Sequence, residues 1–412
     1  MTILNRIFSN KPGAFFIDGP GGTGKTFLYR ALLATVRLKG FIAIATTTSG
    51  VAASVLPGGR TAHSCFKLPI DVGENYCCNI SKQSSLAFLI QDAKLIVWDE
   101  VSMARKKLVE TFDSLFRDVM GINTLFGGKV VVFGGDFRQT LPVVKSGAKK
   151  DFIRECLLYS NIWDHLQKFR LTQNMRACKD PAFCEYLLRI GHGREEVNEH
   201  DKIEVPKSFL IPFTNEKESL DILFKTVYPN LEMLMSDTSS VTSRVILTTK
   251  NDFVNEINQM FIDKFPTTAV TFIGIDETVE PKDQSQFEDF LHSLNPTGLP
   301  PYNAKIASGD FKGKHVFIPR IPLLCSPDEK LPIQFQRTQF PVRLCFAMTI
   351  NKAQGQTLDS VGIYLREPVF SHDQLDVALS RAKSSDCDYK SVGYLPQKEP
   401  DKYQDKNKKT IC

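Results

Sequence analysis

The sequence has few of the features that mark secreted, membrane-spanning or disulfide-stabilised proteins. Its 412 residues contain ten cysteines and no C-x-x-C pair, whereas a disulfide scaffold would be shorter and richer in cysteine. Reduced thiols in the cytosol or nucleus fit this usage better. No window reaches about 18 uncharged apolar residues, and the first ten residues carry Arg6 without a long apolar core. We therefore expect neither a membrane span nor a signal peptide.

Neither the net charge nor the spacing of possible metal ligands points strongly to a partner or a metal. The net charge of +5 favours a polyanionic partner such as nucleic acid only weakly. Cys178, Cys184, His192 and His200 are separated by five and seven residues, outside the close pairs that zinc sites use. We expect no zinc centre.

The apolar runs of the chain predict an α/β fold. A chain of 412 residues is too long for one ordinary core, so two or three domains are expected. Short β-rich runs each end in a polar cluster, as in parallel sheets whose loops carry function at the carboxyl ends of the strands. The first series covers residues 41–45, 95–98 and 130–133, and the second covers residues 245–247, 346–348 and 361–365.

The most informative motif follows the apolar run 15–17 and has the full spacing of a phosphate-binding loop. Its residues are Gly19, Pro20, Gly21, Gly22, Thr23, Gly24, Lys25 and Thr26. The glycines let backbone N–H groups turn towards an anion, Lys25 can reach the outer phosphates, and the Thr26 hydroxyl can bind Mg²⁺. A glycine-rich turn without a ligand is a remote alternative, because all eight positions match and helical spacing follows. The motif predicts a bound nucleoside triphosphate with Mg²⁺.

Two further features complete a plausible hydrolytic site. Asp99 and Glu100 end an apolar strand, where we assign Asp99 to Mg²⁺ and Glu100 to activating the attacking water. Such a pair means little alone, but it is expected to be catalytic after a full phosphate loop. Arg176 and Arg381 are candidates for the positive charge that stabilises the leaving phosphate. From single motifs, a surface arginine in a weak salt bridge is an equally good interpretation.

These motifs occur in an order that resembles the Pif-type DNA helicases, in the RecD-like, 5′-to-3′ branch of superfamily one, particularly the plant and Helitron-like relatives. The resemblance runs from about residue 13 to 383, and its later blocks are more specific than the phosphate loop. The matching blocks are residues 19–26, 45–53, 59–64, 98–103, 134–139, 173–176, 349–357 and 378–381.

The resemblance implies two RecA-like P-loop NTPase domains with parallel sheets and an ATP cleft between them. We expect the first domain over residues 1–176, with a DNA-splitting wedge near 66–93 that includes Leu68-Pro69-Ile70; a core hairpin is the equally good alternative. A helical or irregular connection over 177–240, a second domain over 241–396 and a polar tail over 397–412 follow.

The resemblance also assigns roles to individual residues. Lys25, Thr26, Asp99 and Glu100 keep the roles derived above, Gln139 resembles the γ-phosphate sensor, and Arg176 and Arg381 resemble arginines that reach the nucleotide from opposite sides. Gly355 belongs to a block that touches nucleotide and DNA. The expected contacts to single-stranded DNA are Thr47, Thr48, Ser49, Thr61, His63, Lys352, Gln354, Gln356 and Thr357.

Some expected segments are absent or shortened. The family's adenine-contacting glutamine segment has no counterpart before the loop, since the first glutamine is Gln83, which leaves adenine selectivity open. Residues 300–317 are expected to lack a strand of the second domain. Residues 383–388 are polar where a closing strand is expected.

The resulting function is an ATP-dependent 5′-to-3′ DNA helicase or translocase. It would act on single-stranded DNA and on 5′-tailed duplexes or forks, in repair, recombination and telomere maintenance, with no membrane partner and no small-molecule substrate beyond ATP. The nucleus is the expected compartment, with the mitochondrion as the alternative. Two rivals stay open: a catalytically weak, DNA-binding remnant of a transposon-derived helicase, and a small-molecule phosphotransferase. DNA-stimulated ATP hydrolysis distinguishes all three.

Overall fold

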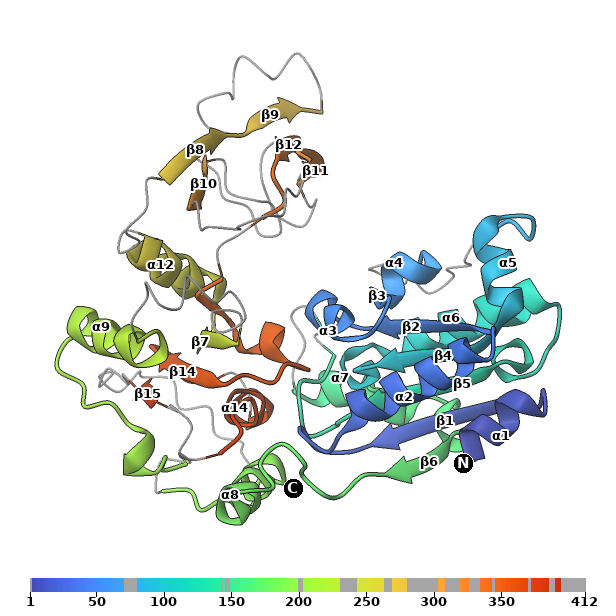
Figure 1. Ribbon diagram of the computed structural model, residues 1–412, viewed down its shortest axis with the longest axis horizontal. Helices are drawn as coiled ribbons and strands as arrows, with labels where there is room; N and C mark the ends of the chain where they lie inside the picture. The colour runs from blue at the N-terminus through green and yellow to red at the C-terminus, as the bar shows by residue number, and fades with distance from the viewer. Residues whose placement is uncertain are drawn as a thin grey trace. The chain divides into compact units, whose positions relative to one another are not determined.

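The computed structural model describes residues 2–69, 80–142, 144, 149–198, 203–229, 243–262, 269–279, 303–307, 319–325, 334–342, 345–369, 372–384 and 390–393 (Figure 1). It divides into two compact units. The first comprises Met1–Val227, Ile246–Thr249 and Met348–Cys412, and the second comprises Tyr228–Val245 and Lys250–Ala347. These compact units need not coincide with RecA-like domains. The boundaries expected at residues 176, 240 and 396 therefore remain predictions.

A six-stranded sheet in the order β3-β2-β4-β5-β1-β6 forms the centre of the first unit. All five pairs of neighbouring strands are parallel, which confirms the α/β fold expected from the sequence. The four central strands are mostly apolar on both faces because helices cover both faces of a parallel sheet. Their bounds are β1 Gly13–Asp18, β2 Ile42–Thr47, β3 Arg60–Thr61, β4 Ala93–Asp99, β5 Val130–Gly135 and β6 Gln167–Arg170.

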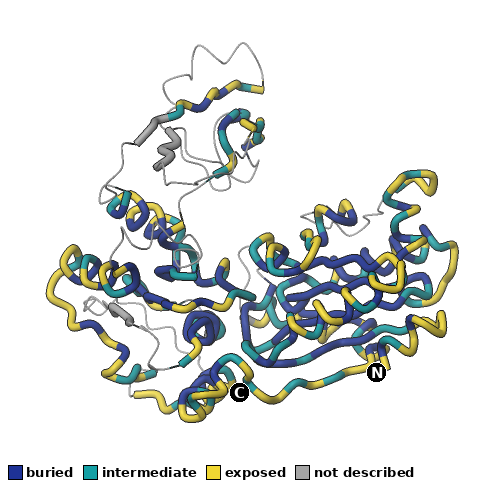
Figure 2. The backbone as a smooth tube through the Cα atoms, viewed as in Figure 1, coloured by how far each residue is buried: buried dark blue, intermediate teal, exposed yellow. Residues whose placement is uncertain are grey.

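Two hydrophobic clusters hold the helices to this sheet, whose central strands appear as dark, buried tubes in Figure 2. One cluster is aromatic: Phe112 packs on Trp98 and Phe116 at ring-centroid distances of 5.1 and 4.3 Å. The other contains Tyr29 and Leu33, which are fully buried. The surrounding helices are α1 Thr2–Phe8, α2 Lys25–Leu38, α3 Gly50–Val55, α4 Ala62–Phe66, α5 Ser85–Asp92, α6 Lys106–Met120 and α7 Lys149–Arg154.

The expected wedge lies partly inside this core. Leu68 is 4% exposed and belongs to the aromatic cluster, as the core interpretation of this segment requires. Ile70 and the following residues up to 79 lie outside the described residues. A splitting role for residues 66–93 therefore stays a prediction.

A smaller sheet in the order β13-β7-β14-β15 follows in the chain. Its strands are β13 Ala347–Thr349, β7 Arg244–Thr248, β14 Ser360–Leu365 and β15 Lys390–Gly393, and β14 and β15 are parallel. The expectation that a polar segment replaces the closing strand is wrong, because β15 begins just after that segment. The helices of this part are α8 Pro181–Gly191, α9 Glu216–Val227 and α14 His372–Leu379.

The second unit contains helix α12, Asn251–Ile262, and two small antiparallel sheets. One pairs β8 Ala269–Ile273 with β10 Asn303–Ala307, so a strand does lie within the segment 300–317 that was expected to lack one. The other has the order β11-β12-β9, with bounds Ile321–Leu324, Phe335–Gln339 and Ile275–Thr278. The remainder of 300–317 lies outside the described residues.

Short 3-10 helices connect these elements. They are η1 Val101–Met103, η2 Leu125–Gly128, η3 Leu157–Tyr159, η4 Trp163–His165, η5 Lys207–Phe209 and η7 Ile350–Ala353. Throughout the described ranges, every helix is too short or too polar to cross a membrane.

A buried ion pair joins two strands of the second unit. Arg337 and Asp276 are register partners with fully buried side chains, and two hydrogen bonds of 2.7 Å connect the guanidinium to both carboxylate oxygens. Removing one partner of such a pair leaves a buried charge without its main counter-ion.

We therefore expect Asp276→Ala to lower the free energy of unfolding of the second unit by about 3–5 kcal/mol, as for other broken buried pairs. The double substitution Asp276→Leu/Arg337→Met removes both charges and should restore most of the loss. Urea unfolding of the three proteins measures both effects. A double variant no more stable than the single one would contradict this account.

Candidate nucleotide site

The phosphate loop connects β1 to α2 and depends on glycine at two positions. Gly22 and Gly24 have φ angles of 88° and 87°, in the left-handed region that side chains with a Cβ rarely adopt. The Thr23 hydroxyl donates a 2.9 Å hydrogen bond to the Pro20 carbonyl and closes the turn. The loop thus delivers its backbone to the amino end of α2, where the helix dipole favours an anion.

Lys25 is the first residue of α2 and is 8% exposed. Its ammonium donates hydrogen bonds to the carbonyls of Gly19 and Pro20, so the positive charge lies over the loop itself. Thr26 is half-buried in the same helical turn. Both residues lie in the first turn of α2, and their roles towards phosphate and Mg²⁺ stay predictions.

Asp99 and Glu100 lie at the carboxyl end of β4, which runs between β2 and β5. They are 5% and 4% exposed, and the Glu100 N–H donates a 2.8 Å hydrogen bond to Asp99 Oδ1. Burial and the neighbouring Glu100 raise the pKa of Asp99 to about 7, while Lys25 opposes this shift. Two adjacent buried carboxylates offer the hard oxygen ligands that Mg²⁺ prefers.

Glu100 has an unusual backbone conformation and a specific partner. Its φ of 55° is a left-handed value that is strained for a non-glycine residue and is often found at functional sites. Gln354 Nε2 donates a 2.7 Å hydrogen bond to Glu100 Oε2, and the Gln354 side chain is completely buried. Gln354, expected to contact DNA, thus points to the carboxylate assigned to water activation.

The next residue, Gly355, also lies close to Glu100 and has a φ of 85°, in the left-handed region. A Cβ placed there would lie 3.2 Å from the Ala52 Cβ and 3.6 Å from Glu100 Oε1. The block 349–357 therefore reaches the acidic pair through its glycine and its buried amide.

Gly21 brings the loop into contact with the predicted sensor and one predicted arginine. A Cβ added at Gly21 would lie 2.7 Å from Gln139 Nε2 and 3.2 Å from Arg381 Nη2. Two segments far from the loop in the sequence, those of Gln139 and Arg381, therefore approach the same glycine. A larger residue at Gly21 would displace these side chains.

Arg176 is connected to both the loop and the segment that carries Arg381. The N–H groups of Met175 and Arg176 donate hydrogen bonds of 2.9 and 3.1 Å to the Gly22 carbonyl. The guanidinium of Arg176 donates to the Ser380 carbonyl. Burial and the nearby Arg381 lower the pKa of Arg176 to about 9.

Arg381 is 1% exposed, so the surface interpretation of this arginine is wrong. Its guanidinium donates to the carbonyls of Val377 and Gln356 at 2.8 and 3.0 Å and to Ser380 Oγ at 2.7 Å. Burial lowers its pKa, whereas the carboxylates of Glu100, Asp376 and Asp136 favour the charged form. Its own segment thus holds Arg381 in a fixed orientation beside Gly21.

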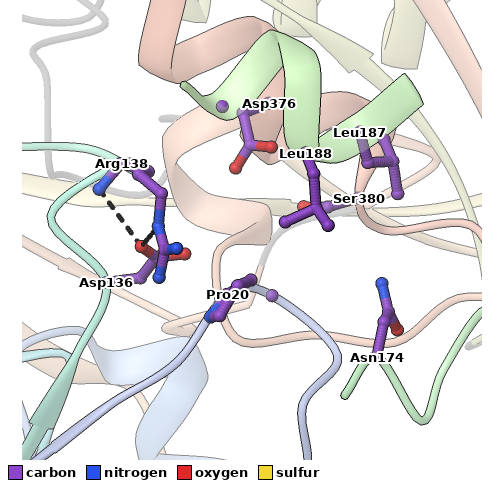
Figure 3. A pocket seen from close by; sticks show the side chains of 10 residues that line it. Pro20, Asp136, Arg138, Asn174, Leu187, Leu188, Asp376 and Ser380 are labelled. Carbon is purple, nitrogen blue, oxygen red and sulfur yellow. Dashed lines mark hydrogen bonds and ion pairs between the residues drawn. The ribbon is translucent and has the colours of Figure 1, made fainter. Parts of the chain in front are cut away.

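A pocket opens beside the loop and encloses about 310 Å³, including its open mouth (Figure 3). Arg138 donates a 2.6 Å hydrogen bond to Asp136 in its wall, and Asp376 faces the same space from α14. Its lining residues are Pro20, Gly21, Asp136, Arg138, Asn174, Leu187, Leu188, Gly191, Asp376 and Ser380.

Asp376 is a polar member of this site that the sequence motifs did not single out. Burial and the nearby Asp136 raise its pKa to about 7, against the opposing effects of Arg381, Gln139 and Arg138. It stands five residues before Arg381, just outside the block 378–381. The sequence signal that could have identified Asp376 is a carboxylate one helical turn before the arginine of a motif block.

The hydroxyls expected to contact DNA have local structural partners. Ser49 and Thr61 accept 3.2 Å hydrogen bonds from the backbone at the starts of α3 and α4, as N-caps do. The Thr47 hydroxyl donates to the Ser49 carbonyl at 2.6 Å, and the Thr48 hydroxyl donates to the Glu100 carbonyl at 2.7 Å. Thr48 therefore connects the β2 end directly to the acidic pair.

The remaining DNA candidates differ in exposure. Lys352 and Thr357 are exposed, whereas Gln356 is half-buried. Burial lowers the pKa of His63, so its ring is neutral near physiological pH. DNA contact by these residues stays a prediction.

A parallel sheet with a phosphate loop between β1 and α2 is the arrangement found in P-loop nucleotide-binding proteins. Residues 1–201 match the model of the PIF1-like helicase family. The ATP-dependent DNA helicase PIF1 of Danio rerio is 25% identical over 93% of this chain, which spans 59% of that protein. The ATP-dependent DNA helicase Pif1 of Bdellovibrio bacteriovorus is 27% identical, with 90% of this chain and 82% of that protein covered.

A crystal structure of a Pif1 helicase from Bacteroides, in complex with ADP-AlF3 and single-stranded DNA, shares the fold. The TM-score is 0.62 at 21% identity, covering 96% of this chain and 92% of the other. The match over residues 1–201 and these relatives support a relationship to the Pif-type helicases.

The raised pKa of Asp376 predicts a pH dependence of stability. Above its ordinary pKa of 3.8, the unfolded chain loses the proton that the folded chain keeps up to about pH 7. The contribution of Asp376 to stability therefore falls as pH rises through this window, by at most about 1.4 kcal/mol per pH unit.

Asp376→Asn removes this titration, so its stability relative to the wild type should increase from about pH 5 to about pH 7 and then level off. Urea-unfolding midpoints across this range measure the difference. A constant difference would show that Asp376 is ionised in the folded chain throughout.

Proposed function

We propose that this chain is an ATP-dependent 5′-to-3′ DNA helicase or translocase. The proposal rests on the approach of Gln139 and Arg381 to Gly21. These two residues lie about 120 and 360 positions after Gly21 in the sequence. A second strand series with its own motif blocks, and two arginines far apart in the sequence, disfavour a small-molecule phosphotransferase. The names of the relatives, which are ATP-dependent DNA helicases, support the same activity.

In this proposal each residue around the loop has a separate task. The loop N–H groups and Lys25 bind the outer phosphates, and Thr26 and Asp99 hold Mg²⁺, which would neutralise charge on these phosphates. Glu100 orients the attacking water and takes its proton. Gln354 fixes the Glu100 carboxylate by its 2.7 Å hydrogen bond.

Hydrolysis would be sensed by Gln139, Arg176 and Arg381. Arg176 is bonded to Gly22 through its backbone N–H and to Ser380 through its guanidinium, so it joins the loop to the segment of Arg381. A change at the γ-phosphate would therefore move this segment and, with it, Gln354 and Gly355. Coupled movement of DNA-binding elements at the two ends of this path would give translocation.

We further propose that Thr47, Thr48, Ser49, Thr61 and His63 contact single-stranded DNA together with Lys352, Gln356 and Thr357. The support is their place at strand ends and helix starts, where hydroxyls and N–H groups suit phosphates without reading sequence. Thr48 would transmit DNA binding to the active site, because its hydroxyl is bonded to the Glu100 carbonyl.

The biological setting follows from the same family. We propose action in the nucleus on 5′-tailed duplexes and forks during repair, recombination and telomere maintenance. The presence of helicases named PIF1 and RRM3 among the relatives supports this setting.

Substitution of Lys25 tests the nucleotide site. Lys25→Ala removes the charge that meets the outer phosphates, so DNA-stimulated ATP hydrolysis should fall by at least about 100-fold with the fold retained by circular dichroism. Lys39→Ala, at the other end of the same helix, is the matched control and should hydrolyse ATP normally. Persistent hydrolysis by Lys25→Ala would reject the site.

Polarity and coupling are tested with tailed duplexes. The wild-type chain with ATP and Mg²⁺ should displace the strand of a 5′-tailed duplex and leave a 3′-tailed duplex intact. Glu100→Gln should bind the same DNA but displace about 100-fold more slowly, because it lacks the base. DNA binding without turnover in the wild type would support an inactive remnant, and hydrolysis stimulated by a small acceptor rather than DNA would support a phosphotransferase.

A further inference from the structure

Tyr29 places a hydroxyl group behind the phosphate loop. It lies in α2, one turn after Lys25, and its side chain is completely buried in the cluster with Leu33 and Val36. The phenol oxygen lies directly against Gly134 of β5, where an added Cβ would come within 1.6 Å of it. A phenylalanine would fill the same apolar space, so packing does not explain the hydroxyl.

The surroundings of this hydroxyl are acidic. The Cβ added at Gly134 would also lie 3.2 Å from Asp99 Oδ1. The phenol oxygen and the carboxylate therefore lie on the same side of this glycine. Asp99 and Glu100 are the charged groups that act on Tyr29. Within the described part of the chain, the hydroxyl has no hydrogen-bond partner. A buried hydroxyl without a partner is costly, and retaining one needs a reason.

On the basis of the ATPase proposed above, we propose that Tyr29 is a positioning residue whose hydroxyl donates a hydrogen bond to the Asp99 carboxylate when the metal–nucleotide complex is bound. Asp99 would then be held by two donors, the Glu100 N–H and the Tyr29 O–H. Partners behind a metal ligand commonly change metal affinity in this way. Gly134 is required because any side chain there would separate the two groups.

Tyr29→Phe tests this role, because it removes one oxygen atom and keeps the ring. Mn²⁺ binding in the presence of ADP, followed by electron paramagnetic resonance, should weaken about 10-fold. ADP binding in EDTA should stay unchanged, because the loop and Lys25 are intact. The thermal midpoint of the variant should equal or exceed that of the wild type, since a buried unpaired hydroxyl is removed.

A second tyrosine supplies the matched control. Tyr364 in β14 is 2% exposed, and its hydroxyl donates a 2.7 Å hydrogen bond to Glu216, away from the acidic pair. Tyr364→Phe should leave Mn²⁺ affinity unchanged. Unchanged affinity in Tyr29→Phe, or equal weakening in both variants, would overturn the role of Tyr29.

The same measurements separate this role from the proposed function. If the wild type binds no ADP in either condition, the ATPase proposal fails, and the role of Tyr29 fails with it. If the wild type binds ADP and Mn²⁺ but Tyr29→Phe does so equally well, only the role of Tyr29 fails.

Discussion

The absence of a side chain at Gly21 and Gly22 is the constraint on which the site depends. Gly21 lets Gln139 and Arg381 approach the loop, and Gly22 offers its carbonyl to the backbone of Arg176. An added Cβ at Gly22 would lie 2.5 Å from Asn174 Oδ1, so this approach is also close. Glycine here serves two purposes at once: it shapes the loop for an anion, and it admits Gln139 and Arg381, the groups proposed to respond to that anion.

The electrostatics of the site follow from this crowding. Arg381 and four carboxylates are buried around one loop beside the half-buried Arg176, and desolvation alone would disfavour these charges. The carboxylates favour the charged forms of the arginines, and Lys25 and Arg381 oppose the protonation of Asp99 and Asp376. Because opposite charges favour and like charges oppose one another's ionisation here, adding or removing one negative group changes the pKa values of its neighbours. Such a cluster is well suited to respond to a triphosphate that gains or loses its terminal phosphate.

The sequence predicted the parallel sheet, the phosphate loop and the acidic pair because each follows from a local pattern. Eight consecutive residues specify the loop, and Asp99 ends an apolar run that could only be a buried strand. The inward direction of Gln354 was not predictable in this way, because it depends on Glu100, which lies 254 positions earlier in the chain. Tyr29 and Asp376 were missed for a related reason: each belongs to an ordinary helical pattern, and only tertiary packing places its oxygen near a carboxylate. The strand β15 was missed because polar residues precede it and its pairing with β14 is not local.

The Arg337–Asp276 pair has a consequence for how the second unit tolerates change. Side chains alternate between the two faces of a strand, so sliding β12 by one residue along β9 would turn the guanidinium to the opposite face. A short sheet with few apolar contacts would otherwise accept several alignments. With this pair in place, the connections around these strands can lengthen or shorten over evolution without altering which residues oppose one another.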